Sequence, residues 1–220
     1  MKTLLQSDHL ILIPENDVAG ATLASWRATH ADFAFAMLPN SGAGAALIAL
    51  GPRAEACREP INVTSDSPNP IRLIANFAPT PFVLDGIAYA CVEAFWQSVR
   101  FPVDERPSKA GLDGTLAKRE SERQPYDTHV FYGGIAVAVG TYEHWQLMRR
   151  ACRAKFEQNA DARAALLETG DRPLIHQVRR DSRTIPGVIM ADIWMRLRAN
   201  LRRDGSRQAN SVSGRGRDRD

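Results

Sequence analysis

The chain has 220 residues, of which 44% are hydrophobic and 24% are charged, a balance typical of one globular domain with an apolar core. The longest apolar runs, such as HLILIP and GGIAVAVG, are too short to cross a bilayer, so no membrane partner is expected. Lys and Arg exceed Asp and Glu by 28 to 25, and the whole excess lies after Leu201, where six Arg meet three Asp.

The cysteines and histidines indicate the compartment and argue against a metal site. Cys57, Cys91 and Cys152 are far apart and flanked by apolar residues. Reduced core thiols of a cytoplasmic protein explain this pattern better than a disulfide framework or a zinc site. The five histidines form no ligand-like pair, so neither a metal nor another cofactor is expected.

The N-terminal part is predicted to mix strands and helices. Residues 8–13 suit a short strand, and the apolar spacing of residues 18–37 predicts an amphipathic helix. Residues 39–52 indicate a turn followed by a short helix that stops at Gly51-Pro52. INVTS, residues 61–65, is typical of a strand.

The middle of the chain contains shorter elements. Residues 71–86 suit two short strands with a proline-constrained bend between them, and Asp85-Gly86 is a turn signal. A helix is predicted over residues 89–101, and a shorter one around residues 112–119 inside a charged crossing. HVFYGGIAVAVG, residues 129–140, indicates a strand interrupted by glycines.

The C-terminal part is predicted to be mostly helical. Helices are expected over residues 141–158 and 159–170, and a last helix begins near Pro186. RPLIHQV, residues 172–178, suits a strand between them. Strands and helices mix without strict alternation, which predicts an α+β fold, a helix-rich domain with a small β-sheet.

The helix over residues 89–101 carries a single carboxylate, Glu93, in an apolar stretch. One face of this helix is apolar and is formed by Val92, Phe95, Trp96 and Val99. Glu93 lies on the flank of that face with Gln97 and Arg100. Partial desolvation there would raise the carboxyl pKa and suit it to general acid–base catalysis. The same periodicity fits an ordinary amphipathic helix equally well, so both interpretations stay open.

Other polar candidates also have structural explanations when taken alone. Asp181, in VRRDSRTIPG, fits an N-cap or turn residue, and Lys155, in CRAKFEQN, fits an exposed lysine near a helix C-terminus. Aromatic residues such as Phe77 and Trp96 fit a core, although their faces could also stack on a base. The signatures GxGxxG, GxSxG and HExxH and the Walker loop are absent from the sequence.

Three ordered blocks of the sequence resemble the NADAR (YbiA-like) family. The blocks are INVTSDSPNPIRLIANFAPTPFVLDGIAYACVEAFWQSVRF, LMRRACRAKFEQNADARAALLETGDRPLI and DSRTIPGVIMADIWMRLRANL. They carry counterparts of the family's S-N-F, P-F-x-x-D-G, A-K-F-x-Q-N and L-L-x-T-G motifs. The resemblance implies a YbiA-like domain over residues 60–202, with residues 1–59 as a subfamily extension packed on the core.

The resemblance implies an N-glycosidase, a hydrolase that cleaves the bond between a ribose carbon and a base nitrogen. Its implied substrates are ADP-ribose attached to guanine-type bases, free or in nucleic acid, and phosphorylated ribosyl-pyrimidine intermediates. The family's catalytic carboxylates fall on Glu93 and Asp181. The implied substrate-binding residues are Asn62, Asn76, Phe77, Trp96 and Lys155, with Lys155 as a phosphate anchor.

The chain also departs from the family pattern. Ala94 replaces the histidine that follows the family glutamate, and His176 replaces a later glutamate. A non-catalytic ADP-ribose or NAD-binding module is therefore the alternative function. Residues 203–220 are polar and rich in Gly and Ser, which predicts a disordered basic tail, either solubilising or in weak contact with nucleic-acid phosphates.

Overall fold

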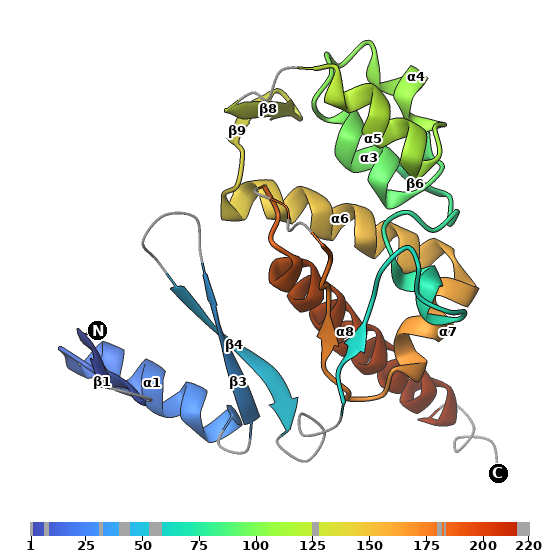
Figure 1. Cartoon of the computed structure of the whole chain (residues 1–220). Coiled ribbons are helices and arrows are strands. Elements are labelled where there is room, and N and C mark those ends of the chain that lie inside the picture. Colours follow the sequence, from blue (N-terminus) through green and yellow to red (C-terminus); the bar gives the residue numbers. More distant parts are fainter. Residues whose placement is uncertain are drawn as a thin grey trace.

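Two long helices, α6 (Tyr142–Gln158) and α8 (Gly187–Gly214), lie across each other at the centre of the domain (Figure 1). Helix α3 (Val92–Ser98) packs on α6, and α7 (Ala160–Glu168) packs on both long helices. The computed structural model describes residues 2–6, 9–30, 33–39, 45–52, 59–124, 128–179, 182 and 184–214. The fold is α+β and helix-rich, which confirms the predicted class.

The core lies where α6, α8 and α3 meet. Buried side chains recur every three or four positions on α6, which makes it amphipathic; they include Trp145, Met148, Cys152 and Phe156. From the other side, α8 contributes Met190, Trp194, Leu197 and Leu201. Phe95 of α3 completes the cluster with no exposed surface. Helix α3 is thus held on its apolar face, and its flank is left for polar residues.

The strands of the domain form separate pairs, where we expected one small sheet. β5 (Ile61–Asn62) pairs in parallel with β10 (Leu174–Ile175). β6 (Phe82–Leu84) and β7 (Ile87–Tyr89) form a hairpin. Its turn is the predicted Asp85-Gly86, whose φ angles of 50° and 79° are the positive values of a type I′ turn.

A second hairpin replaces the glycine-interrupted strand that we predicted. β8 (His129–Tyr132) and β9 (Ile135–Ala138) pair antiparallel around Gly133-Gly134, with φ angles of 57° and 79°. The two glycines therefore mark a tight turn, because both central positions of a type I′ turn need positive φ.

Short helices surround α3. η1 (Ile71–Ile74) is a 3-10 helix where a strand was predicted, because Leu73 N–H donates to Pro70 O (2.9 Å) and closes a tight turn. α4 (Arg106–Ala110) and α5 (Gly114–Glu122) both pack on α3. Asp113 caps α5, since its Oδ1 accepts from Thr115 N (2.8 Å) and Leu116 N (3.0 Å).

The N-terminal elements differ most from the predictions. β1 (Lys2–Gln6) and β2 (His9–Ile13) form a hairpin, and α1 (Asp17–His30) ends well before the predicted helix end. β3 (Phe33–Pro39) and β4 (Ala45–Pro52) pair as strands, so the helix predicted to reach residue 37 and the short helix of residues 39–52 are wrong there. Short apolar runs fit either structure, and pairing between the two segments decides in favour of strands.

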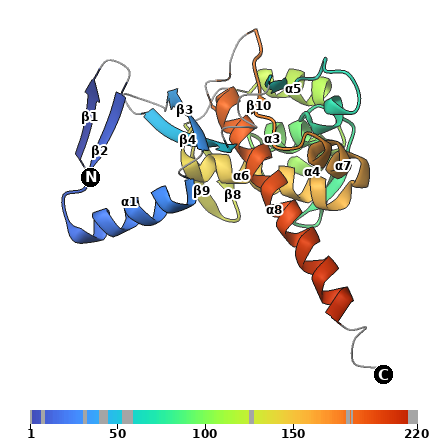
Figure 2. The same ribbon diagram turned by 90° about the horizontal axis from the view of Figure 1, so that it is seen from below.

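The N-terminal extension and the end of α8 both bear on the predicted domain boundaries. β1, β2 and α1 lie to one side of the helical domain in both views (Figures 1 and 2), and none of the α1 side chains is buried. Packing of residues 1–59 on the core thus remains a prediction. Helix α8 continues to Gly214, so the backbone is helical over most of the segment 203–220 that we expected to be disordered. Its end projects beyond the domain (Figure 2).

Candidate active site

Glu93 lies in the first turn of α3, where the chain leaves the β6–β7 hairpin. Cys91 caps this helix, because its Sγ accepts from Ala94 N (3.4 Å). The N–H of Glu93 donates to the backbone carbonyl of Asn76 (3.0 Å), which ties the helix start to the segment after η1. The residue is buried, with 7% of its surface exposed. Glu93 is therefore not a solvated residue of the helix surface but lies at the edge of the core.

The surroundings of the Glu93 carboxyl favour its neutral form. Its Oε1 accepts a hydrogen bond from Gln97 Nε2 (2.7 Å), one turn further along α3. Burial raises the pKa of Glu93, while the Gln97 hydrogen bond and the cation Lys118 act in the opposite direction. A carboxyl with a raised pKa can hold or accept a proton closer to neutral pH, as general acid–base catalysis requires.

Phe77 lies on the segment after η1 and follows Asn76, whose carbonyl accepts from Glu93 N–H. A Cβ added at Gly114 would lie 2.7 Å from Phe77 Cδ1, so the start of α5 rests directly on the ring. Lys118, one turn along α5, lies with its Nζ 5.9 Å from the centre of the same ring. Phe77 is partly exposed, which leaves aromatic surface for a base to stack on.

The side chain of Asn76 faces the core. Its Nδ2 lies 3.8 Å from Met148 Sδ and 3.7 Å from Met190 Sδ, and Cys152 Sγ lies 3.9 Å from its Oδ1. In this conformation Asn76 supports the site through its backbone carbonyl, which holds Glu93, and its amide meets sulfur atoms of α6 and α8.

Lys155 is fully buried, which contradicts its interpretation as an exposed lysine. Its Nζ donates to the carbonyls of Ile74 (3.0 Å) and Ala75 (2.8 Å), and burial lowers the pKa of Lys155 to about 8. A phosphate group has no access to this ammonium in the structure. Lys155 instead fixes the segment that carries Asn76 and Phe77 against α6.

The remaining predicted residues do not all gather at Glu93. Asn62 lies on β5 and extends its pairing with the chain after β10, because its side chain bonds Gln177 N (2.9 Å) and Gln177 O (3.0 Å). Trp96 is buried and packs against His144, with ring centres 4.3 Å apart and the ring planes tilted by 38°. His176 donates from Nδ1 to Val63 O (2.7 Å), which holds it against the residue that follows β5. Asp181 lies outside the described residues.

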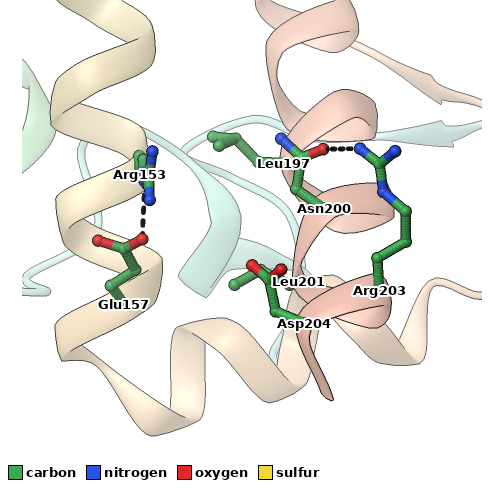
Figure 3. Close-up of a pocket in the computed structure, with 7 residues that line it drawn as sticks. All are labelled: Arg153, Glu157, Leu197, Asn200, Leu201, Arg203 and Asp204. Carbon is green, nitrogen blue, oxygen red and sulfur yellow. Dashed lines mark hydrogen bonds and ion pairs between the residues drawn. The ribbon is translucent and has the colours of Figure 1, made fainter. Parts of the chain in front are cut away.

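Two cavities lie away from this cluster. One, of about 320 Å³, opens between α6 and α8 (Figure 3), lined by Arg153, Glu157, Leu197, Asn200, Leu201, Arg203 and Asp204. Its charges already pair locally, as Arg153 Nε with Glu157 Oε1 (2.7 Å) shows. The other, of about 540 Å³, lies along α1. Neither contains a predicted site residue. The candidate site and these two cavities therefore lie in different places.

Sequence reasoning gave no role to three residues near Glu93: Gln97, which donates to its carboxyl, Arg100, which contacts Gln97, and Lys118, whose charge acts on the carboxyl. Gln97 and Arg100 were placed on its flank, but only their helical spacing could have indicated a contact. Lys118 comes from α5, and no sequence signal connects it with Glu93. Among the described residues, no group of three or more His, Cys, Asp or Glu side chains could hold a metal ion. None of the described helices combines the length and apolar character needed to cross a membrane.

Comparisons with known proteins give a family and a fold. The NMR structure of the E. coli protein YbiA is similar, with a TM-score of 0.52 and 24% sequence identity over 70% of this chain and 92% of that chain. This likeness supports the predicted YbiA-like fold. A comparison with curated proteins gives no match. The family model of bacteriophage protein GP30.3 matches residues 70–200, which is more than half of the sequence. The chain therefore belongs to the bacteriophage protein GP30.3 family.

Proposed function

We propose that this chain is an N-glycosidase in which Glu93 is the reacting carboxylate. The observation that carries the proposal is the buried Glu93 carboxyl, which accepts a hydrogen bond from the neutral amide of Gln97. The YbiA-like fold supports it, because the same residues 60–202 resemble the NADAR family in sequence.

The chemistry follows from the charge that develops at the ribose carbon. As the C–N bond breaks, its electron pair leaves with the base and the sugar takes on oxocarbenium character. A carboxylate beside that carbon stabilises the positive charge. Water then bonds to the carbon, and its proton passes to Glu93, whose raised pKa favours accepting it.

Phe77 and Asp181 would contact the substrate in the proposed function. Phe77 would stack on the base, and Asp181 would hold the water or the ribose hydroxyls. Lys155 is assigned a supporting role, since it binds two backbone carbonyls. The substrates we propose are ADP-ribose linked to guanine-type bases and phosphorylated ribosyl-pyrimidines.

A non-catalytic ADP-ribose-binding module is the second candidate. The observation that favours it is the burial of Glu93, which is only 7% exposed and so is little accessible to a substrate, while both cavities described above lie elsewhere. Such a module would bind ADP-ribose and release no product.

The test incubates the purified chain with ADP-ribosylated guanosine, ADP-ribosylated DNA and a ribosylaminopyrimidine phosphate. Mass spectrometry would detect released base together with ADP-ribose or ribose phosphate. We expect Glu93→Gln to lower turnover at least about a hundredfold with little change in substrate affinity. The matched control is Glu122→Gln, which makes the same charge change at an exposed position of α5. Equal rates in Glu93→Gln and the wild type would exclude the assigned role. Stabilisation by ADP-ribose without any product would favour the binding module.

A further inference from the structure

The Glu93 carboxyl is one end of a hydrogen-bonded row that runs along α3 to α5. Gln97 Nε2 donates to Glu93 Oε1 (2.7 Å), and Arg100 NH1 lies 3.4 Å from Gln97 Oε1. Arg100 is itself held by α5 and the residues after it, through Ser121 Oγ (3.0 Å) and the carbonyl of Gln124 (3.0 Å). Glu93 and Gln97 are four residues apart on α3 and so lie on the same face, and Arg100 lies just beyond the end of this helix.

Arg100 determines which way the Gln97 amide points. A guanidinium only donates hydrogen bonds, so the Gln97 oxygen must face Arg100. The NH₂ group of Gln97 must then face Glu93. Gln97 can therefore donate to Glu93 but cannot accept a proton from it in this arrangement.

This orientation distinguishes the two oxygens of Glu93. Oε1 is occupied by Gln97. In the described part of the chain Oε2 has no hydrogen bond. Among the described residues, the fully buried side-chain polar atom without a partner is Trp194 Nε1, so Oε2 is not fully buried. The small exposed area of Glu93 therefore leaves Oε2 in contact with solvent.

We propose that Gln97 is a positioning residue that binds Oε1 of Glu93 and thereby makes Oε2 the oxygen that takes the proton of the attacking water. This inference rests on the proposed function. In the step, the water oxygen bonds to the ribose carbon, the C–N electron pair leaves with the base, and the water proton moves to Oε2. Since Gln97 donates to the carboxylate, it stabilises the ionised form that acts as the base.

Other titratable groups also face α3 and must be separated from the effect of Gln97. They are Lys118 from α5, His144 from α6, Arg106 from α4, Tyr89 from β7 and Cys91 at the helix cap. All of them are unchanged in a Gln97 variant, so a difference from the wild type reports on Gln97 and on Arg100, which loses its contact with Gln97.

The test measures the titration of Glu93 by NMR of its side-chain carboxyl carbon, assigned by comparison with Glu93→Gln. We expect Gln97→Met, which fills a similar volume without a hydrogen bond, to move the Glu93 midpoint upward. Gln97→Asn, too short to reach the carboxyl, should do the same. Gln158→Met is the control, because Gln158 bonds the backbone of Val83 elsewhere, and it should leave the midpoint in place. In the wild type, the side-chain NH₂ signals of Gln97 should follow the Glu93 midpoint. This last measurement needs no variant to fold.

Kinetics separate this inference from the proposed function. With a substrate that the wild type turns over, Gln97→Met should lower kcat about tenfold or more, because one hydrogen bond to a reacting group is lost. The acidic limb of the pH profile of kcat should move to higher pH. The positioning role would be overturned if the titration midpoint of Glu93 were unchanged in Gln97→Met. It would also be overturned if the Gln97 NH₂ signals of the wild type did not change with pH at the Glu93 midpoint. If the wild type turned over none of the substrates but its Gln97 signals followed the Glu93 midpoint, the proposed function would be contradicted and the contact between Gln97 and Glu93 would stand.

Discussion

Replacing Gly114 by alanine tests how closely α5 packs on the ring of Phe77. An added Cβ would lie 2.7 Å from Cδ1, 3.0 Å from Cγ and 3.2 Å from the backbone Cα of Phe77. Because one of these three atoms belongs to the backbone, rotation of the ring alone cannot relieve the overlap, so α5 or the segment after η1 must move. Overpacking of this kind costs about 1–3 kcal/mol, and the gain in helix propensity at a first-turn position returns less than about 1 kcal/mol.

We therefore expect Gly114→Ala to lower the free energy of unfolding by about 1–2 kcal/mol and the melting temperature by about 2–8 °C. Urea denaturation measures the first, and a thermal melt measures the second. The aromatic NMR signals of Phe77 should shift as well. If Phe77 stacks on the substrate, substrate affinity should fall in the same variant.

The control is Gly111→Ala, three residues earlier. Gly111 has a φ of −80°, which any residue adopts, and no atom lies within 4 Å of its added Cβ. This variant should be stabilised by about 0.4–1 kcal/mol, because alanine reduces the freedom of the unfolded chain. If Gly114→Ala were as stable as Gly111→Ala, the close approach of α5 to Phe77 would be refuted.

Two further predictions concern buried charges. Burial raises the pKa of Glu93 above its ordinary 4.5, so the folded state keeps a proton that the unfolded state has lost, and stability falls as pH rises through that window. Glu93→Gln should accordingly melt higher than the wild type at pH 7.5, with the difference vanishing below pH 4.5; equal melting at both pH values would contradict this. Lys155→Met should cost about 1–3 kcal/mol in urea, because it leaves the Ile74 carbonyl unpaired. The pKa of Lys155 in the folded state, about 8, is below its ordinary 10.5, so the free energy of unfolding of the wild type should rise between pH 8 and 10.5. The difference in stability between the wild type and Lys155→Met should therefore grow over this pH range. Lys109→Met is the control and should show no such growth.

The sequence predicted the long helices best, because their periodicity extends over several turns. The stripe of α6 and the Asp85-Gly86 turn could be read directly from residue types. The segments that became β3, β4 and η1 are short apolar runs or proline-rich stretches, and only their partners decide their structure. Local patterns do not contain those partners.

The candidate site shows the same limit. Glu93 could be singled out because a carboxylate beside Trp96 breaks an apolar pattern, and its burial agrees with that choice. Lys155 was misjudged because a lysine in the last turn of a helix is normally exposed. Its two carbonyl partners come from a segment about eighty residues earlier, as the bonds to Ile74 and Ala75 show. Lys118 reaches the site by the packing of α5 on α3, which no spacing within either helix indicates.

Three consecutive carbonyls, those of Ile74, Ala75 and Asn76, join α6 to α3: the first two accept from Lys155 and the third accepts from Glu93 N–H. The Glu93 N–H is thus tied, through one short segment, to the lysine of α6. A nascent chain that has emerged only as far as α5 would contain Glu93, Gln97 and Phe77, yet would lack the lysine that fixes their neighbours. Under the proposed function, activity would arise in the last stage of folding, and an incompletely synthesised or unfolded chain would turn over no substrate.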